Sequence, residues 1–259
     1  MIPFFRKIRK KLADDNKPIK YLRYAIGEIV LVVIGILIAL QINNWNQNKI
    51  IQKENTQLIK NILDDFNVNK KRLDKSINLV ETLIGHSDRL LKLISKSEIT
   101  ASTDSLKYYT ASSFRSVLFQ PDLNSYEQAL SSGAFGRIDN LKLSNSLANF
   151  MESYKDYIDT NQLANESFYV GIIKDLHKEV GNLESIGFRY FYKERDYDYE
   201  LFKNERDYKT FLKKPLFFAS VQNTLIFYQN MLDSFKGMQS STENIIIELN
   251  KVLEISRKG

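Results

Sequence analysis

Hydrophobic and polar residues follow two different patterns along the chain. Residues 25–42 read AIGEIVLVVIGILIALQI, and the twelve residues Ile29–Leu40 contain no polar side chain. From residue 43 to about 95, and again after residues 140 and 215, apolar residues recur three, four or seven positions apart. This spacing is typical of amphipathic helices that bury one face. The sequence therefore predicts one wholly apolar helix followed by three long amphipathic helices.

The first amphipathic helix should continue from the apolar helix with little interruption, because no proline occurs between them. Two polar residues, Asn69 and Ser87, stand at positions expected in its buried seam. The second helix should begin after a cap at Asp139 or Asn140 and run to about residue 183, and the third should begin at Pro215. The three predicted seams are Ile59, Ile62, Phe66, Leu73, Ile77, Val80, Ile84, Leu91 and Ile94; Leu143, Leu147, Phe150, Tyr154, Tyr157, Ala164, Phe168, Ile172, Leu176, Val180 and Leu183; and Phe217, Val221, Leu225, Tyr228, Leu232, Phe235, Ile245, Leu249 and Val252.

Shorter elements connect the long helices. Residues 95–104 are polar and predict a loop, and residues 104–120 predict a short helix. Ser125 and Gln128 have the spacing of a capping box, and Gly133 is suited to a helix C-cap. No strand pattern of useful length occurs. We therefore expect an all-α fold, with one N-terminal transmembrane helix followed by an antiparallel long-helix bundle.

The apolar helix is long enough to span a bilayer, since its 18 residues extend roughly 27 Å at 1.5 Å per residue. A buried core helix would rarely be apolar on every face. A cleaved signal peptide is a second alternative, but Ala39-Leu40-Gln41 is a poor cleavage site. An uncleaved signal anchor is the better interpretation.

The net charge of +6 lies entirely before the apolar helix. Residues 1–24 hold eight bases and two acids (8 − 2 = +6), whereas the rest of the chain holds 29 bases and 29 acids. Basic residues beside a span favour anionic lipid headgroups as partners, and nucleic acid is not expected. The positive-inside bias predicts a cytoplasmic tail at residues 1–24, a transmembrane helix at 25–42 and an extracytoplasmic domain at 43–259.

Several residues in and beside the span have expected roles. Tyr21 and Tyr24 at the inner edge, with Trp45 at the outer edge, are expected interfacial anchors. Gly35 and Ala39 form a small-xxx-small pair, and Glu28 lies seven residues before Gly35 on the same helical face. This face predicts packing against a second copy or another membrane protein. In the alternative, Glu28 only extends toward the inner interface.

Motifs of enzyme chemistry are missing from the sequence, which has no P-loop, GxGxxG, GxSxG or HExxH pattern and no cysteine. The two histidines, His86 and His177, have carboxylates nearby and could ligate a metal across antiparallel helices. Ordinary surface or boundary positions are the better interpretation of both. We therefore expect no catalytic residue, cofactor or metal site.

Aromatic residues are concentrated between residues 187 and 214, where nine occur among charges of both signs. Tyrosine beside arginine is the composition of binding hot spots. Tyr190, Tyr192, Tyr197 and Tyr199 are thus a candidate partner surface. The alternative is that these rings cap the end of the bundle.

The N-terminal part of the chain resembles a known family. Residues 20–45, KYLRYAIGEIVLVVIGILIALQINNW, with the basic opening FFRKIRKKL, are similar to an uncharacterised family of bacterial membrane proteins with a divergent helical domain. Residues 125–133, SYEQALSSG, also resemble a pattern of this family. The resemblance implies a Gram-negative inner-membrane anchor with a periplasmic domain, and it implies no activity.

Two kinds of function fit these features. The first is a membrane-anchored extracytoplasmic interaction or scaffold module. The second is a ligand-binding sensory bundle that signals through a partner membrane protein, because a tail of 24 residues cannot hold an output domain. A large apolar pocket inside the bundle would favour the sensor. A filled core with an exposed aromatic patch would favour the scaffold.

Overall fold

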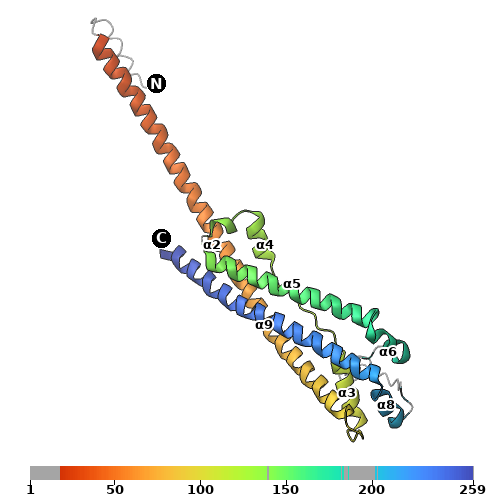
Figure 1. Ribbon diagram of the computed structural model, residues 1–259. Coiled ribbons are helices and arrows are strands. Elements are labelled where there is room, and N and C mark those ends of the chain that lie inside the picture. The colour runs from red at the N-terminus through yellow and green to blue at the C-terminus, as the bar shows by residue number, and fades with distance from the viewer. Residues whose placement is uncertain are drawn as a thin grey trace. The chain divides into compact units, whose positions relative to one another are not determined.

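The computed structural model describes residues 18–138, 140–181, 183, 186, 202 and 204–258, and all regular structure in these residues is helical. The chain divides into two compact units, Met1–Gln57 and Leu58–Gly259. Figure 1 labels the helices of both units. The all-α prediction is confirmed.

The first unit consists, in its described residues, of the N-terminal part of helix α2 (Pro18–Ile94). Every residue from Ile29 to Glu54 is exposed. Among the described residues, α2 alone is long and apolar enough to cross a membrane, judged by length and composition, and none of its most apolar window is buried. A core helix would have most of that window covered, whereas a membrane anchor or a signal sequence would not.

The second unit is built on three long helices: α2 from Leu58 onward, α5 (Leu141–Tyr169) and α9 (Pro215–Lys258). Pairs between α2 and α9 run in opposite order along the two helices. Lys70 contacts Glu243 at 2.9 Å, Asp74 accepts from Gln239 at 2.7 Å, and Glu81 contacts Lys236 at 3.1 Å. These two helices are therefore antiparallel.

Helices α5 and α9 are antiparallel as well. Asn140 donates to Glu248 at 3.0 Å near one end, and Asn223 donates to Ser167 at 2.6 Å near the other. Since α9 opposes both other helices, α2 and α5 run in the same direction (Figure 1). The chain must therefore travel back along the bundle between the end of α2 and the start of α5.

That return path contains helix α3 (Thr103–Ser113), a non-helical segment at residues 114–123, helix α4 (Asn124–Ser131) and the short helix η1 (Phe135–Arg137). We call residues 114–123 the crossover. Helices α6 (Ile172–Val180) and α8 (Glu205–Leu212) lie between α5 and α9 in the sequence. The prediction of a helix over residues 104–120 is thus correct only as far as Ser113.

Two further details correct the sequence predictions. The helix expected from 140 to 183 is broken at Val170 and Gly171, whose N–H groups both donate to the Glu166 carbonyl, at 2.8 and 3.0 Å. These bonds end α5, and α6 begins after Gly171. The proposed capping box at Ser125 is also wrong, because α4 begins at Asn124.

Other predicted helix ends are confirmed. Asn140 is the N-cap of α5 and accepts from the Leu143 N–H at 3.0 Å, and Pro215 begins α9. Gly133, which follows α4, has a φ of +68°, a conformation that glycine adopts without strain. These positions were predictable because capping depends on local residue type.

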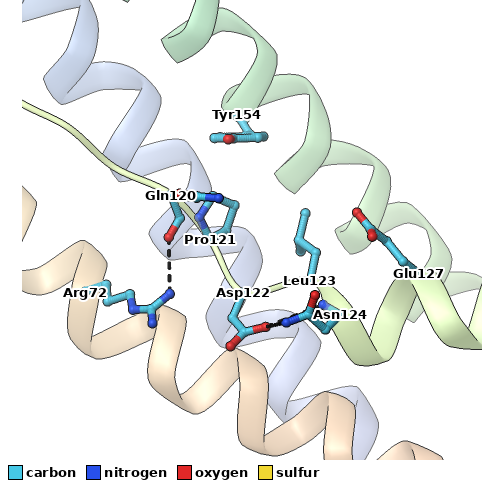
Figure 2. A pocket seen from close by; sticks show the side chains of 8 residues that line it. All are labelled: Arg72, Gln120, Pro121, Asp122, Leu123, Asn124, Glu127 and Tyr154. Carbon is cyan, nitrogen blue, oxygen red and sulfur yellow. Dashed lines mark hydrogen bonds between the residues drawn. The ribbon is translucent and has the colours of Figure 1, made fainter.

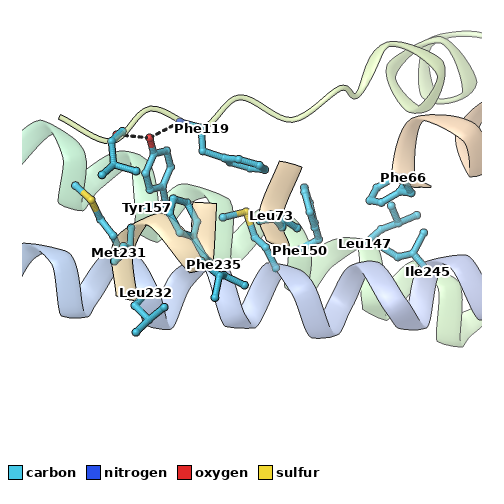
Figure 3. Close-up of a cluster of buried hydrophobic side chains, with 14 of the residues drawn as sticks. Phe66, Leu73, Phe119, Leu147, Phe150, Tyr157, Met231, Leu232, Phe235 and Ile245 are labelled. Atoms are coloured by element: carbon cyan, nitrogen blue, oxygen red, sulfur yellow. Dashed lines mark hydrogen bonds between the residues drawn. The ribbon is translucent and has the colours of Figure 1, made fainter. Parts of the chain in front are cut away.

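Aromatic and aliphatic side chains fill the middle of the bundle (Figure 3). Phe66 of α2 and Phe150 of α5 are fully buried, with ring centroids 5.3 Å apart and nearly perpendicular planes. Tyr157 of α5 packs 5.0 Å from Phe235 of α9. A second buried cluster joins the end of α2 to α3, α6, α8 and the start of α9. Two buried apolar clusters therefore fill the unit, one in the middle of the bundle and one where the end of α2 meets the start of α9.

Candidate functional site

The crossover differs from the helices around it, because none of its N–H groups after Arg115 makes a helical hydrogen bond to the described residues as the chain passes over the core. Val117 and Phe119 are buried, whereas Leu118 and Gln120 between and after them are exposed. An alternation with a period of two is typical of extended chain. The crossover therefore presents one face to the core and the other to solvent.

Side chains from all three long helices hold the crossover in place. Asn69 of α2, which is fully buried, donates to the Asp122 carbonyl and accepts from the Asp122 N–H, each at 2.7 Å. Three residues further along α2, Arg72 donates from one Nη to the Gln120 carbonyl at 3.2 Å. Helix α2 thus supplies hydrogen bonds that a neighbouring strand would supply in a sheet.

Two tyrosines hold the other part of the crossover. The Tyr157 hydroxyl accepts from the Phe119 N–H at 2.8 Å and donates to the Val117 carbonyl at 3.2 Å (Figure 3). Tyr228 of α9 directs its hydroxyl to the Arg115 carbonyl, at 2.7 Å, and to the Ser112 carbonyl, at 3.2 Å. Burial raises the pKa of Tyr157, so this hydroxyl keeps its proton at neutral pH.

Helix α4 is positioned by α2 as well. Asp65 of α2 accepts from the Ser125 N–H at 3.1 Å, and it occupies the role of the missing side-chain cap of α4. Asp122 accepts from the Asn124 N–H at 3.4 Å and from the Asn124 side chain at 2.9 Å. The start of α4 is therefore fixed by two carboxylates, which also suit the positive end of a helix.

A cavity of about 620 Å³ opens where the crossover meets α4 (Figure 2). Its wall combines charged groups, amides and one aromatic ring. The lining residues are Arg72, Gln120, Pro121, Asp122, Leu123, Asn124, Glu127 and Tyr154. This volume suits a small molecule or a few side chains of a bound polypeptide.

The charges of the cavity are only partly neutralised. Glu127 makes no side-chain hydrogen bond or ion pair with the described residues, and Arg72 has a single hydrogen bond, to a neutral carbonyl. Among the described residues, the Asp122 carboxylate accepts hydrogen bonds only from Asn124. Two carboxylates and one guanidinium leave the cavity with one excess negative charge (1 − 2 = −1). We therefore take the crossover cavity as the candidate binding site.

The residues predicted to pack the membrane span remain on one continuous helix. Gly35 and Ala39 are exposed, Glu28 is half-buried, and a Cβ built on Gly35 meets nothing within 4 Å. The Lys49 Nζ lies 4.5 Å from the centroid of the exposed Trp45 ring. The side chains of Tyr21 and Tyr24 lie outside the described residues. The roles expected for all six residues stay predictions.

The two histidines occupy separate half-buried positions. His86 of α2 packs against Tyr108 and Tyr109 of α3, at centroid distances of 5.0 and 5.4 Å. Burial lowers the pKa of His86 and also that of His177 on α6. Within the described part of the chain no three His, Asp or Glu side chains are grouped closely enough to hold a metal ion.

The aromatic segment is described only at its C-terminal end. Tyr208 and Phe211 are buried, and Phe202 packs against both rings at 4.9 and 5.3 Å. These three rings close the end of the bundle, as the alternative interpretation expected for the segment. Tyr190, Tyr192, Tyr197 and Tyr199, the candidate partner surface, lie outside the described residues.

The sequence contained one clear sign of the crossover site. Asn69 stands in a seam of apolar residues, and a buried amide requires hydrogen-bond partners. Its partner, the Asp122 backbone 53 positions away, could not be identified from the sequence. The sequence pattern placed Tyr157 in a buried seam as an apolar residue. It could not predict that the Tyr157 hydroxyl would donate to the Val117 carbonyl.

Comparison with known proteins identifies the family of the chain. A family model described as "Family of unknown function (DUF6090)" matches residues 28–181, more than half of the chain. This range includes the whole crossover, the eight residues that line its cavity, and Asp65, Asn69 and Tyr157. No curated protein and no solved structure matches the chain.

Proposed function

Since the chain belongs to this family of unknown function, DUF6090, we propose its function from its own residues: it is a membrane-anchored helical module that binds another protein. The anchor is the exposed apolar part of α2, and the binding module is the bundle of the second unit. We place the anchor in a bacterial inner membrane, with the N-terminus in the cytoplasm and the bundle in the periplasm. The placement is supported by the eight basic residues before the span and by the resemblance of residues 20–45.

The filled interior of the bundle is the observation that carries the proposal. Phe66, Phe150 and Phe235 are fully buried and occupy the space between the long helices. The crossover cavity opens to solvent, and so does a cavity of about 670 Å³ lined by residues of the 97–99 loop and α8. The bundle therefore offers binding groups on its surface, which suits a macromolecular partner.

A ligand-binding sensory bundle is the alternative function. It would need an enclosed apolar chamber between the helices, as small-molecule sites in bundles usually have. Neither the crossover cavity nor the cavity beside α8 is enclosed in this way. A small polar ligand in the crossover cavity remains the form of this alternative that fits the molecule.

Crosslinking in native membranes tests the proposal. Full-length protein with a C-terminal affinity tag is treated in intact membranes with an amine-reactive crosslinker, and adducts are purified under denaturing conditions. We expect a discrete adduct with another polypeptide or with a second copy. A matched control replaces residues 25–42 by an unrelated apolar span, which separates binding by the bundle from binding by the span. Recovery of uncrosslinked monomer alone, at native expression level, would contradict the proposal.

A further inference from the structure

We propose that the crossover recognises an extended peptide segment of the partner protein. The segment adds a strand beside residues 116–118 and places a basic side chain in the crossover cavity. This inference rests on the proposed function, because it names the surface and the chemistry by which the module binds. The partner would bind along the exposed edge of the crossover at residues 116–118.

The first support is the free edge of the crossover backbone. Tyr157 binds the Val117 carbonyl and the Phe119 N–H, which face the core. In extended chain the N–H and C=O of the intervening residue, Leu118, point to the opposite side. Neither group hydrogen-bonds to any described residue, and the same holds for the backbone of Ser116. An exposed edge of this kind accepts an added strand by backbone hydrogen bonds.

The second support is an apolar side chain at the same edge. Leu118 is 81% exposed, the largest value among the exposed large hydrophobic residues described. Its neighbours on either side, Val117 and Phe119, already anchor the crossover in the core, so Leu118 is not needed there. A partner strand that crosses this edge would cover the Leu118 side chain, which is favourable by the hydrophobic effect.

The third support is that the edge is held rigidly before any partner arrives. Asn69, Tyr157 and Tyr228 each make two hydrogen bonds to backbone groups in or just before the crossover. A loop fixed in this way loses little conformational entropy on binding.

The cavity defines the charge of the expected segment. It begins at Gln120, two residues beyond Leu118, which corresponds to roughly 7 Å of extended chain. A strand paired at residues 116–118 would therefore carry its next side chains to the cavity mouth. There the ring of Tyr154 and the carboxylate of Glu127, which forms no ion pair with the described residues, favour a cation. The excess negative charge acts in the same sense. We therefore expect a lysine or arginine in the bound segment.

The test uses a phage-displayed library of random 12-residue peptides and full-length protein in lipid nanodiscs. We expect enrichment of peptides that combine an apolar residue with a lysine or arginine a few positions away. Leu118→Asp and Glu127→Gln should each weaken the enriched peptides about tenfold or more, because each removes one recognition contact. The matched controls are Leu141→Asp, at a residue 75% exposed on α5, and Glu152→Gln, at an exposed carboxylate on the same helix.

Amide hydrogen exchange of the complex tests strand addition separately from side-chain docking. With an enriched peptide bound, exchange in the range 116–120 should slow by about tenfold or more, because the Leu118 N–H gains a hydrogen bond. Unchanged exchange there would overturn strand addition. Equal peptide binding by Leu118→Asp, or the absence of enriched peptides, would overturn the whole inference. Tighter binding of free amino acids than of peptides, without protection of residues 116–118 from exchange, would also overturn the inference. That result would favour the small-ligand alternative.

Failure of this inference can be distinguished from failure of the proposed function. A photoreactive amino acid placed at position 118 in native membranes should crosslink to the partner, whereas one placed at position 141 should not. If the amine-reactive adduct forms but position 118 yields no crosslink, the module binds its partner through another surface. In that case the proposed function stands and the crossover has only a structural role.

Discussion

Asn69 of α2 and Asp122 of the crossover exchange two hydrogen bonds, both 2.7 Å long, across 53 positions of sequence. The Asn69 amide donates to the Asp122 carbonyl, and the Asp122 N–H donates to the Asn69 amide oxygen. Because Asn69 is fully buried, its amide depends on these two bonds for its hydrogen-bond partners. Together with Arg72, which donates to the Gln120 carbonyl, this side chain fixes where the returning chain lies against α2.

Asn69→Leu should destabilise the bundle by about 1–3 kcal/mol, because the N–H and the carbonyl of the half-buried Asp122 would lose their partners. Thermal and urea unfolding, followed by circular dichroism, measure the change. Asn67→Leu, at an exposed asparagine two residues away, should alter the free energy of unfolding by about 0.5 kcal/mol or less. A loss at Asn69 no greater than that at Asn67 would contradict the role assigned to the bond pair.

Removal of one hydroxyl tests the second attachment of the crossover. Tyr157→Phe keeps the ring in the core but leaves the Phe119 N–H and the Val117 carbonyl without a partner. We expect a loss of about 1–3 kcal/mol in the free energy of unfolding. Tyr154→Phe is the matched control, since its half-buried ring lines the cavity and its hydroxyl makes no hydrogen bond to the described residues. Equal effects at the two tyrosines would refute the assignment.

The long helices could be predicted from the sequence because their period and caps are local. The seam residues Ile62, Phe66 and Phe150 are buried as expected, and Asn140 caps α5. The crossover could not be predicted, because its backbone is held by side chains 38 to 113 positions away. The sequence pattern placed Val117 and Phe119 in a short helix over residues 104–120. A short run of apolar residues fits a helix and a buried extended segment equally well.

The relative direction of the helices could not be predicted from the local sequence pattern either. Three long helices with short loops would alternate in direction. Here the connection from Ile94 to Leu141 is long enough to return the chain, so α2 and α5 run the same way. Ion pairs between helices, such as Lys70–Glu243, show which way two helices run relative to each other. The sequence alone does not show which residues form these pairs.

Two glycines in long helices should respond oppositely to the same substitution. Gly85→Ala in α2 should stabilise the bundle by about 0.5–1 kcal/mol, because alanine favours helix and its Cβ would meet nothing within 4 Å. Gly237→Ala in α9 should give no such stabilisation or should destabilise the bundle, because the alanine Cβ would lie 2.6 Å from the Ser153 Oγ of α5. Melting temperatures of both variants decide the point. The double variant Gly237→Ala, Ser153→Ala should recover stability, and no recovery would contradict close helix contact there.

Stability should fall as the pH is lowered from about 7.5 to 5.5. The pKa values of His86 and His177 are lowered by burial, so the unfolded chain, with histidines near 6.5, binds protons more readily than the folded chain. Unfolding then takes up protons, and the free energy of unfolding decreases as the pH drops through about 6.5. The double variant His86→Gln, His177→Gln should show a flatter dependence of melting temperature on pH in this range. A steeper or unchanged dependence would show that other groups control it.

Reporter fusions test the orientation of the span. Alkaline phosphatase folds only outside the cytoplasm, so its fusion after residue 60 should be active in a Gram-negative host, whereas a fluorescent reporter that needs the cytoplasm should be dark there. The physical cause is the charge bias: eight basic residues lie in residues 1–24, and three, Lys49, Lys53 and Lys60, lie within about twenty residues after the span. Changing Arg6, Lys7, Arg9, Lys10 and Lys11 to glutamate should lower phosphatase activity. The tail would then lack the positive charge that keeps it in the cytoplasm. The matched control exchanges the same five residues between lysine and arginine, which keeps the charge and should keep the activity. Activity that survives the glutamate variant would mean that the apolar helix is oriented by something other than its basic tail.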